Sequence, residues 1–410
     1  MDMIYRFKTS TPTTVGIAVL TALAMQACGG GGVDGGGTGG TEPPAYANGP
    51  ISGFGSIIVG GVRYDDSAAT VRNDDNQSLS SSDLRLGMVV AIDGKNLDRS
   101  LGTGVANSVV VSSELVGPVT ASVVATGDLT VLGQPVKVTT STVFDDRLVG
   151  GHSAITIGSV VEVYAVYDPT TGTYTASRVE PKSSASTYKV RGVVSANNTT
   201  QRTFRIGAAT FTYAAGAAPA GLADGLLIRV KVGTSPDSNG YWVIASSDTS
   251  RPKPSDGVEV EVEGVIANYS SAASFTVNGI PVNASSASLS PSGSALAAGL
   301  RVEAEGKMTA GVLVATKVEV KKPESSGGDD DDGGSDDSSK EYEIKSTVQS
   351  VDTAAKTFVV KAGAQKVNYA GATFKDGTVA DLKVGAKVEV KGRISSDGTV
   401  VNATEVKFDD

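Results

Sequence analysis

The segment that decides the fold reads Val384-Gly385-Ala386-Lys387-Val388-Glu389-Val390-Lys391-Gly392. A glycine near its start is followed by residues that alternate between apolar and charged, and a second glycine closes it. Alternation with a period of two predicts a β-strand buried on one face, and the first glycine predicts a tight turn leading into that strand. We call this segment the third element, because in each repeat it follows a strand start and a hairpin. The same pattern recurs around Gly87, Gly158, Gly225 and Gly299.

The residues around each copy also repeat. Each copy begins with an apolar strand start, at Ile51, Val116, Val190, Val262 and Ile344. An alternating segment around a glycine follows each start and is typical of a hairpin. A small alanine then lies 16 to 20 residues after the third-element glycine, at Ala106, Ala176, Ala245, Ala315 and Ala403. We therefore predict one β unit repeated in tandem.

The repeats divide the body of the chain into five expected modules, at residues 50–114, 115–186, 187–255, 256–324 and 341–410. The modules lack a sustained apolar period of 3.6 residues, which predicts an all-β fold. A small closed barrel of the OB-like or SH3-like kind avoids exposed sheet edges and suits modules of this size. Short linkers between the modules predict a string of barrels with modest contacts.

The N-terminus predicts export and lipid attachment. Residues 1–27 combine basic residues with a short apolar run and read as a signal peptide. The run ends at Ala27-Cys28, which resembles the lipobox of bacterial lipoproteins and contains the only cysteine of the chain. The resemblance implies a lipid on Cys28 and, because Gly29 follows, an outer-membrane location. Residues 28–49 are rich in glycine and predict a tether.

The repeated glycines and the Val-x-Val segments, clearest at 388–392, resemble a recognised bacterial family, the domain of unknown function numbered 5666. The resemblance covers most of the chain after residue 50 and implies tandem β modules on lipoproteins of the cell envelope. It implies no activity.

An acidic stretch separates the fourth and fifth expected modules. Residues 325–340 contain six aspartates and one lysine. Such a block is typical of a self-repelling, disordered linker. Calcium binding is the alternative, but an EF-hand counted from Asp329 would place Gly333 at a ligand position and Lys340 at the twelfth position.

The sequence gives little support for catalysis or for a resident cofactor or metal. His152 is the only histidine, so a histidine cluster cannot form, and its glycine-rich loop predicts a polar surface residue. A Ser-His-Asp triad remains formally open because sequence alone does not supply its geometry. The acidic pairs are at Asp65-Asp66, Asp74-Asp75 and Asp145-Asp146. They lie in expected turns and suit backbone bonding better than glycoside hydrolysis.

Composition also limits the expected partners. The net charge is −9 and aromatic residues make up 5% of the chain, which argues against nucleic acid, since that partner needs a basic groove with stacking aromatics. The candidate platform for a glycan consists of Tyr164, Tyr167, Tyr174 and Trp242. Half-buried packing is the competing interpretation of these rings.

We expect a non-catalytic, lipid-anchored envelope protein with a structural, adhesive or scaffold role. The alternative is a binding module for a glycan or an extended peptide, and a hydrolase is a distant third.

Overall fold

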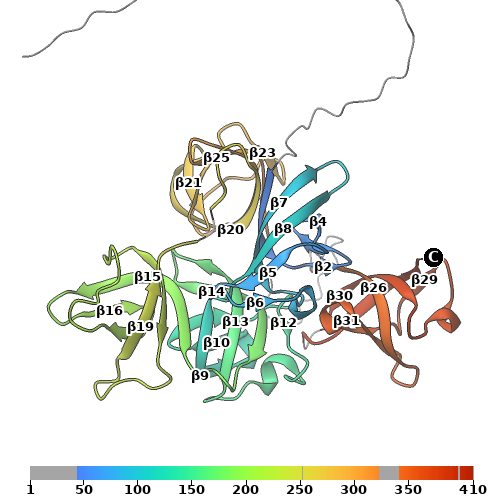
Figure 1. The fold of residues 1–410 in the computed structure, drawn as a ribbon, viewed down its shortest axis with the longest axis horizontal. Coiled ribbons are helices and arrows are strands. Elements are labelled where there is room, and N and C mark those ends of the chain that lie inside the picture. The colour runs from blue at the N-terminus through green and yellow to red at the C-terminus, as the bar shows by residue number, and fades with distance from the viewer. Residues whose placement is uncertain (1–43, 252, 323–340, 396–397, 410) are drawn as a thin grey trace, which may run out of the picture. The chain divides into compact units, whose positions relative to one another are not determined.

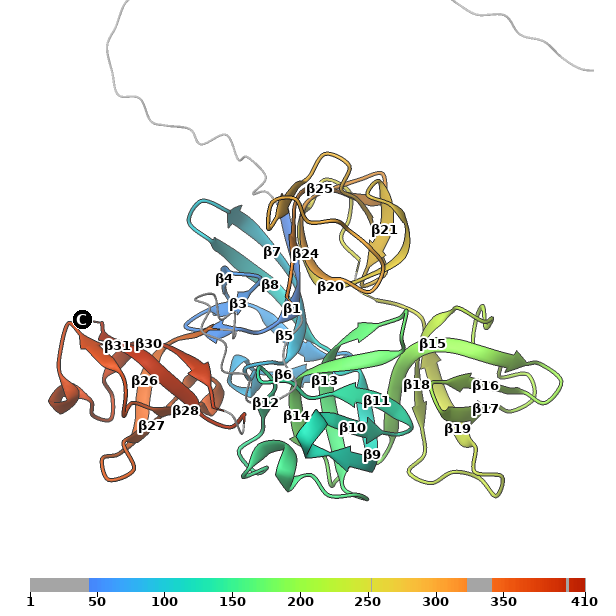
Figure 2. The ribbon, with the colours of Figure 1, turned by 180° about the vertical axis from the view of Figure 1, so that it is seen from behind.

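The computed structural model describes residues 44–251, 253–322, 341–395 and 398–409. The described chain consists of β-strands joined by turns and five short 3-10 helices (Figures 1 and 2). This confirms the predicted all-β class. Cys28, the signal peptide, residues 28–43 of the expected tether and the acidic linker lie outside the described residues. The tether prediction is wrong for residues 44–49, because they belong to the first strand, Pro44–Pro50, in which Ala45, Tyr46 and Ala47 are buried.

The strands fall into five consecutive sets, which we call barrels 1 to 5. Barrel 1 contains β1 (Pro44–Pro50), β2 (Gly53–Phe54), β3 (Ile57–Val59), β4 (Val62–Asp65), β5 (Thr70–Asn73), β6 (Ser78–Leu79), η1 (Ser81–Asp83), β7 (Val89–Asp98) and β8 (Thr103–Val111). Barrel 2 contains β9 (Leu115–Val123), η2 (Val124–Thr126), β10 (Asp128–Val131), β11 (Gln134–Lys137), β12 (Val143–Phe144), η3 (Gly151–Ala154), β13 (Val160–Asp168) and β14 (Thr173–Pro181).

The remaining elements continue in the same order. Barrel 3 contains β15 (Tyr188–Asn198), β16 (Thr203–Ile206), β17 (Ala209–Thr212), β18 (Leu227–Val232) and β19 (Trp242–Asp248). Barrel 4 contains β20 (Glu259–Ser271), β21 (Ser274–Val277), β22 (Ile280–Asn283), β23 (Ser288–Ser290), β24 (Arg301–Thr309) and β25 (Val312–Val320). Barrel 5 contains β26 (Glu341–Asp352), β27 (Thr357–Val360), η4 (Ala362–Ala364), β28 (Lys366–Asn368), β29 (Thr373–Lys375), η5 (Val379–Asp381), β30 (Lys387–Ile394) and β31 (Val401–Phe408).

Barrel 4 shows how each set closes. Strand β20 pairs antiparallel with β21 on one edge and with β24 on the other. Strand β21 pairs with β22, β22 runs parallel to β25, and β24 pairs with β25. The ring of pairings leaves no long open edge and is the five-stranded order of an OB-type barrel.

The same ring recurs in the other four sets. It is formed by β9, β10, β11, β14 and β13 in barrel 2 and by β15, β16, β17, β19 and β18 in barrel 3. It is formed by β26, β27, β28, β31 and β30 in barrel 5. In barrel 1 the first strand is divided into β1, which pairs with β7, and β2, which pairs with β3.

The third-element glycines form the predicted turn in every barrel. In barrel 3 the Gly225 amide donates to the Val194 carbonyl at 2.9 Å, and the Val194 amide donates back to the Leu226 carbonyl at 2.8 Å. The same two bonds recur in the other barrels. Their glycines all have a positive φ, between +79° and +91°, at Gly87, Gly158, Gly225, Gly299 and Gly385. Glycine is required here because other residues rarely adopt this backbone conformation.

The repeated alanines mark a β-bulge between the last two strands. Ala106, Ala176, Ala315 and Ala403 each pair with a small residue directly beside a shift of register. In barrel 3 the matching position is Ile244, and Ala245 is the residue skipped at the shift. The predicted match of Ala245 is therefore offset by one residue.

Gly87 offers a test of the turn, because its surroundings differ from those of Gly158. A Cβ on Gly87 would lie 2.3 Å from the Ser177 carbonyl oxygen of barrel 2, whereas a Cβ on Gly158 would meet nothing within 4 Å. We expect Gly158→Ala to cost about 1 kcal/mol of stability through backbone strain alone. Gly87→Ala adds a clash and should cost about 3 kcal/mol. Urea unfolding measures both, and equal losses would contradict the contact with barrel 2.

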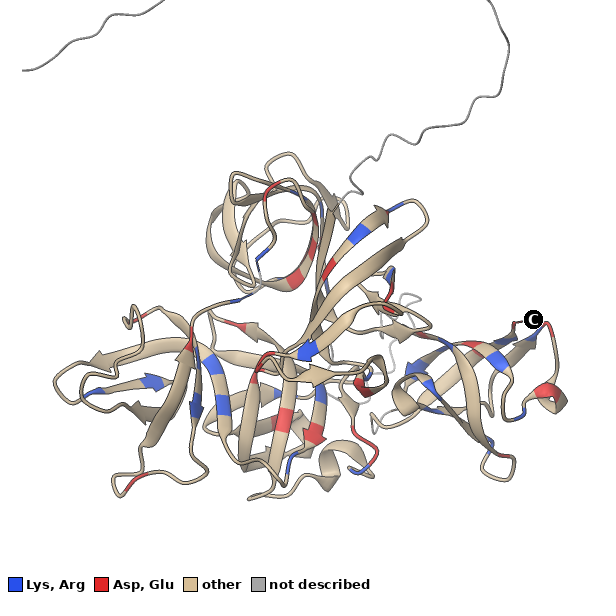
Figure 3. Ribbon diagram, in the orientation of Figure 1, with Lys and Arg blue, Asp and Glu red and all other residues tan. Residues whose placement is uncertain are grey.

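Charged residues occur along strands of all five barrels (Figure 3), while the barrel interiors are apolar. A few charged side chains are nevertheless buried. They include Glu114, Lys189, Arg191 and Glu261, each at most 6% exposed. Most of them lie where one barrel meets another, so their burial reflects docking between barrels.

Strand pairing also joins different barrels, including some that are distant in sequence. Strand β1 runs parallel to β20 of barrel 4, β2 runs parallel to β26 of barrel 5, and β9 pairs with β15 of barrel 3. The expectation of barrels with modest contacts is therefore wrong. The physical reason in barrel 1 is the divided first strand: β2 takes over pairing with the hairpin, which leaves one edge of β1 for β20.

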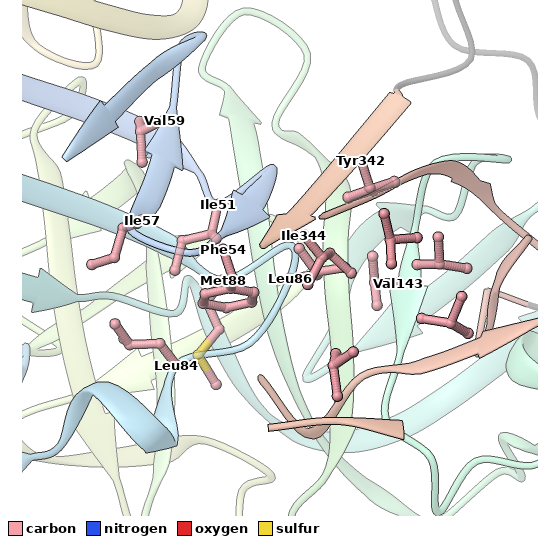
Figure 4. Packing of buried hydrophobic residues seen from close by; sticks show 14 of the residues in the cluster. Ile51, Phe54, Ile57, Val59, Leu84, Leu86, Met88, Val143, Tyr342 and Ile344 are labelled. Carbon is pink, nitrogen blue, oxygen red and sulfur yellow. The ribbon is translucent and has the colours of Figure 1, made fainter. Parts of the chain in front are cut away.

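Barrels 1 and 5 also share a hydrophobic cluster. Phe54 and Leu86 of barrel 1 pack with Ile344 and Tyr342 of barrel 5, and Val143 of barrel 2 joins them (Figure 4). The Tyr342 hydroxyl donates to the Ser141 carbonyl at 3.1 Å. Burial of apolar area across these junctions stabilises the docked arrangement by about 25 cal/mol per Å².

Candidate functional site

A buried aspartate connects barrels 1 and 3. Asp74 lies in the turn between β5 and β6, which the Asn73 side chain holds by accepting the amides of Asp75 and Gln77 at 3.0 and 2.9 Å. The Asp74 carboxylate pairs with Lys189 Nζ at 3.1 Å and with Arg229 Nη1 at 2.9 Å. The Asp74 side chain is 8% exposed. This turn therefore inserts a carboxylate between two cations of barrel 3.

An open cleft of about 390 Å³ lies beside this ion cluster. Barrel 1 contributes Asn73, Gln77 and Leu79, barrel 2 contributes Tyr164, and the connection to barrel 3 contributes residues 184–187. The volume falls within the range of small-molecule sites. We call this feature the three-barrel cleft.

Most of the charged side chains that line the three-barrel cleft form ion pairs, whereas the Asp83 carboxylate accepts hydrogen bonds from the amide and the hydroxyl of Ser80. Lys182 pairs with Glu162 at 2.6 Å, and Lys231 pairs with Asp75 at 2.6 Å. The Ser113 hydroxyl also donates to Glu162 at 2.7 Å. Burial opposes ionisation of Asp75, but hydrogen bonding to Lys231 and the nearby cations hold the pKa of its carboxyl below the usual value. The cleft thus presents mainly ion pairs, with five carboxylates and three lysines among its lining residues.

The four aromatic residues of the predicted platform do not form one surface. The rings of Tyr167 and Tyr174 lie 4.5 Å apart at the contact with barrel 3. The Tyr174 hydroxyl donates to the Arg191 carbonyl, and the Tyr167 hydroxyl oxygen accepts the Val193 amide at 3.2 Å. Both rings are buried, so neither offers an open face to a sugar.

The other two candidates lie elsewhere. Tyr164 is 5% exposed and lines the three-barrel cleft. Burial raises the pKa of its hydroxyl well above the usual value, so the group stays protonated. Trp242 is partly buried and packs edge-on against Tyr188, with ring centroids 5.7 Å apart. Tyr164 is therefore the member of the set that is placed beside a cleft.

His152 is buried in η3, at 7% exposure, so the interpretation of it as a surface residue is wrong. The Ser122 hydroxyl lies 3.1 Å from its Nε2 atom. Burial lowers the pKa of His152, and the nearby Asp128 charge only partly opposes this, so the ring is neutral near pH 7. Asp128 pairs with Lys137 at 2.6 Å, and its carboxylate is thus engaged outside the pair of Ser122 and His152.

The acidic pairs lie in turns or at the ends of strands that lead into turns: Asp74-Asp75 is in a turn, and Asp65 ends β4. Asp65 accepts the Ser67 amide at 3.0 Å, and Asp145 pairs with Arg147 at 2.6 Å. Asp146 lies beside it, and partial desolvation of its carboxyl and the charge of Asp145 raise its pKa. These contacts explain the aspartates as turn and ion-pair residues.

Within the described residues, no group of three or more His, Cys, Asp or Glu side chains is placed to hold a metal ion. Over the same ranges, no helix has the length and hydropathy needed to cross a bilayer.

Comparison with known proteins agrees with the repeated ring of strands. The family model described as a domain of unknown function (DUF5666) matches residues 48–109, 116–180, 263–319 and 345–407, more than half of the chain. The chain belongs to this family. The DUF5666 matches coincide with barrels 1, 2, 4 and 5, and barrel 3 has the same pairings without a match. No curated protein matches the chain.

Sequence reasoning missed the ion cluster because its members lie far apart in the chain. Asp74 looks like an ordinary turn residue, and Lys189 and Arg229 look like outward-facing residues of alternating strands. Nothing local signals that the three meet.

Proposed function

We propose that this DUF5666 protein is a non-catalytic, lipid-anchored scaffold of the cell envelope. The observation that carries the proposal is the structural role of the residues that repeat from barrel to barrel. The third-element glycines close turns, and the repeated alanines, apart from Ala245, lie beside bulges. Charged and aromatic residues near the junctions mainly hold barrels together, as Asp74 and Tyr174 do. These roles favour a structural or adhesive protein over an enzyme.

The proposed anchor is a lipid on Cys28, the only cysteine of the chain. Acyl chains add about 0.8 kcal/mol of membrane affinity for each buried CH₂, and more than one chain is needed for stable attachment. The outer membrane is the proposed location, by the resemblance of Ala27-Cys28-Gly29 to lipoproteins that are not retained at the inner membrane.

A Cys28→Ala variant tests the anchor. We expect the parent protein to incorporate an alkyne-labelled palmitate and to sediment with outer-membrane vesicles. The variant should lose the label completely and should leave the vesicle fraction, because its attachment site is gone. Cys28→Ser, a closer match in size, is the control and should behave like Cys28→Ala. A parent protein without label, or a variant that stays with the vesicles, would contradict lipid anchoring.

A binding module for a glycan or an extended peptide is the second candidate, because the three-barrel cleft has the size of a ligand site. A hydrolase is the third, carried only by the contact of Ser122 with His152.

A further inference from the structure

We propose that the place where barrels 1 to 4 meet is a hydration site, in which an ordered water molecule bridges Glu114 and Arg251. This goes beyond the scaffold function, which does not depend on it. Glu114 directly precedes β9 of barrel 2, and Arg251 lies in the connection between barrels 3 and 4. Both residues line a cavity of about 50 Å³, to which all four barrels contribute. We call it the junction cavity.

The ion pairs around Glu114 are long. Its Oε1 atom lies 3.5 Å from Arg251 Nη2, and its Oε2 atom lies 3.6 Å from Arg191 Nε. The Asp74 carboxylate, by contrast, lies 2.9 and 3.1 Å from its two closest cations. Direct hydrogen bonds between charged groups normally measure about 2.7–2.9 Å. The long contacts of Glu114 therefore leave hydrogen-bonding capacity for a further partner.

Two polar atoms of the residues that line the junction cavity are buried without a hydrogen-bond partner among the described residues. They are Glu114 Oε2, which accepts hydrogen bonds, and Arg251 Nε, which donates one. Glu114 is 6% exposed, so its carboxylate has little access to bulk solvent. Because a buried polar group without a hydrogen bond is unfavourable, the two atoms favour a partner inside the cavity.

The size of the junction cavity suits water. A buried water molecule needs about 10–15 Å³ of cavity volume and roughly two to four polar partners. The cavity has about 50 Å³, and Asn48, Ser112 and Asn278 add polar side chains to its lining. Sites for larger ligands usually have about 300–1,000 Å³. The volume therefore limits the occupant to one or a few molecules of the size of water.

The charges favour a neutral occupant that both donates and accepts hydrogen bonds. Water can accept the N–H of Arg251 and donate to Glu114 at the same time. An anion would be repelled by Glu114, and a cation would be repelled by Arg251 and Arg191. The other carboxylate of the lining, Glu263, pairs with Arg301 at 2.7 Å. It therefore adds no unpaired charge that would attract a cation.

The backbone of Glu114 holds its side chain at the junction cavity. The Glu114 amide donates to the Val163 carbonyl at 3.0 Å, and its carbonyl accepts the Arg191 amide at 2.9 Å. Glu114 is thus fixed to strands of barrels 2 and 3. The proposed water links this fixed carboxylate to Arg251 and so connects barrel 2 to the segment that leads into barrel 4.

A crystal structure of the protein without its signal peptide, at a resolution that shows ordered water, tests the proposal directly. We expect density for a water molecule within about 3.2 Å of both Glu114 Oε2 and Arg251 Nε. A second crystal soaked in bromide should show no anomalous signal at this position. A bromide peak would assign the site to an anion. That result, a cavity without density, or a direct bond between Glu114 Oε2 and Arg251 Nε would overturn the proposal.

An Arg251→Met variant gives a readout in solution, because it keeps an unbranched side chain and removes the Nε donor. Arg205→Met is the control, since Arg205 is exposed and does not line the junction cavity. Oxygen-17 relaxation dispersion counts the water molecules that a protein holds for longer than nanoseconds. We expect Arg251→Met to hold at least one fewer than the parent and Arg205→Met to match the parent. Equal counts in all three proteins would contradict a water held by Arg251.

Discussion

Asp74→Ala should lower the free energy of unfolding by about 3–5 kcal/mol, the largest loss that we expect from a single side chain at a junction. The substitution leaves Lys189 and Arg229 buried without their shared carboxylate. Arg191, 4.0 Å from Asp74, also loses a counter-charge. An uncompensated buried charge costs more than the ion pair contributes, because the low-dielectric surroundings replace water poorly.

Asp75→Ala is the matched control for this prediction. Asp75 is the next residue and pairs with Lys231 and Arg229, but its side chain is 27% exposed and water can replace the carboxylate. We expect a loss of about 1 kcal/mol or less. Urea unfolding followed by tyrosine and tryptophan fluorescence measures both variants. Similar losses for the two aspartates would contradict the buried role of Asp74.

Glu261→Gln should make the protein more stable at alkaline pH. Glu261 of β20 is 2% exposed where barrel 4 meets barrel 1, and its Oε1 atom has no hydrogen-bond partner. Burial and the charge of Glu303 raise the pKa of Glu261 to about 9, against the opposing effect of Arg99 at 3.5 Å. Glutamine has the same shape and carries no charge.

The direction of this pH dependence follows from the number of protons that the folded and the unfolded protein bind. The folded protein holds a proton on Glu261 up to about pH 9, whereas the unfolded chain releases it near the ordinary value of 4.5. The contribution of Glu261 to the free energy of unfolding is therefore full below about pH 4.5. It falls as pH rises from there to about 9, by up to about 1.4 kcal/mol for each pH unit. We expect the parent to weaken from pH 5 to pH 9 and Glu261→Gln to remove that slope.

Glu305→Gln serves as the control, since Glu305 also pairs with Arg99, at 2.9 Å, but has a more exposed side chain, at 16%. This variant should keep the slope of the parent. Unfolding midpoints measured at intervals from pH 5 to pH 9 decide the outcome. A Glu261→Gln variant with the pH dependence of the parent would show that Glu261 is ionised in the folded protein.

The repeated barrel could be predicted from sequence because its determinants are local. A positive φ at Gly225 and alternation along β30 depend on neighbouring residues, and each copy repeats them. The departure of barrel 5 from the repeated glycine in the first strand also has a local explanation. Ser346 replaces the glycine found in the other copies, and its hydroxyl oxygen accepts the Ala362 amide at 2.9 Å.

The junctions could not be predicted, because they depend on residues that are distant in sequence. Glu259, Glu261 and Glu263 alternate with valines and read as one solvent-facing row of a strand. Barrel 1 covers part of this row, so Glu261 and Glu263 are buried. The cleft at Tyr164 and the pairing of Asp74 likewise exist only after barrels 1, 2 and 3 have docked, and no local pattern encodes that event.

Zero-length cross-linking tests the docking of barrels most directly. A carbodiimide joins a carboxylate to an amine only when the two are in contact, and Lys231 Nζ of barrel 3 lies 2.6 Å from Asp75 of barrel 1. The pair of Lys137 and Asp128, also 2.6 Å apart, lies within barrel 2 and controls for reactivity. We predict that mass spectrometry of the cross-linked monomer finds both links. Recovery of the Lys137–Asp128 link without the Lys231–Asp75 link would contradict the docked arrangement.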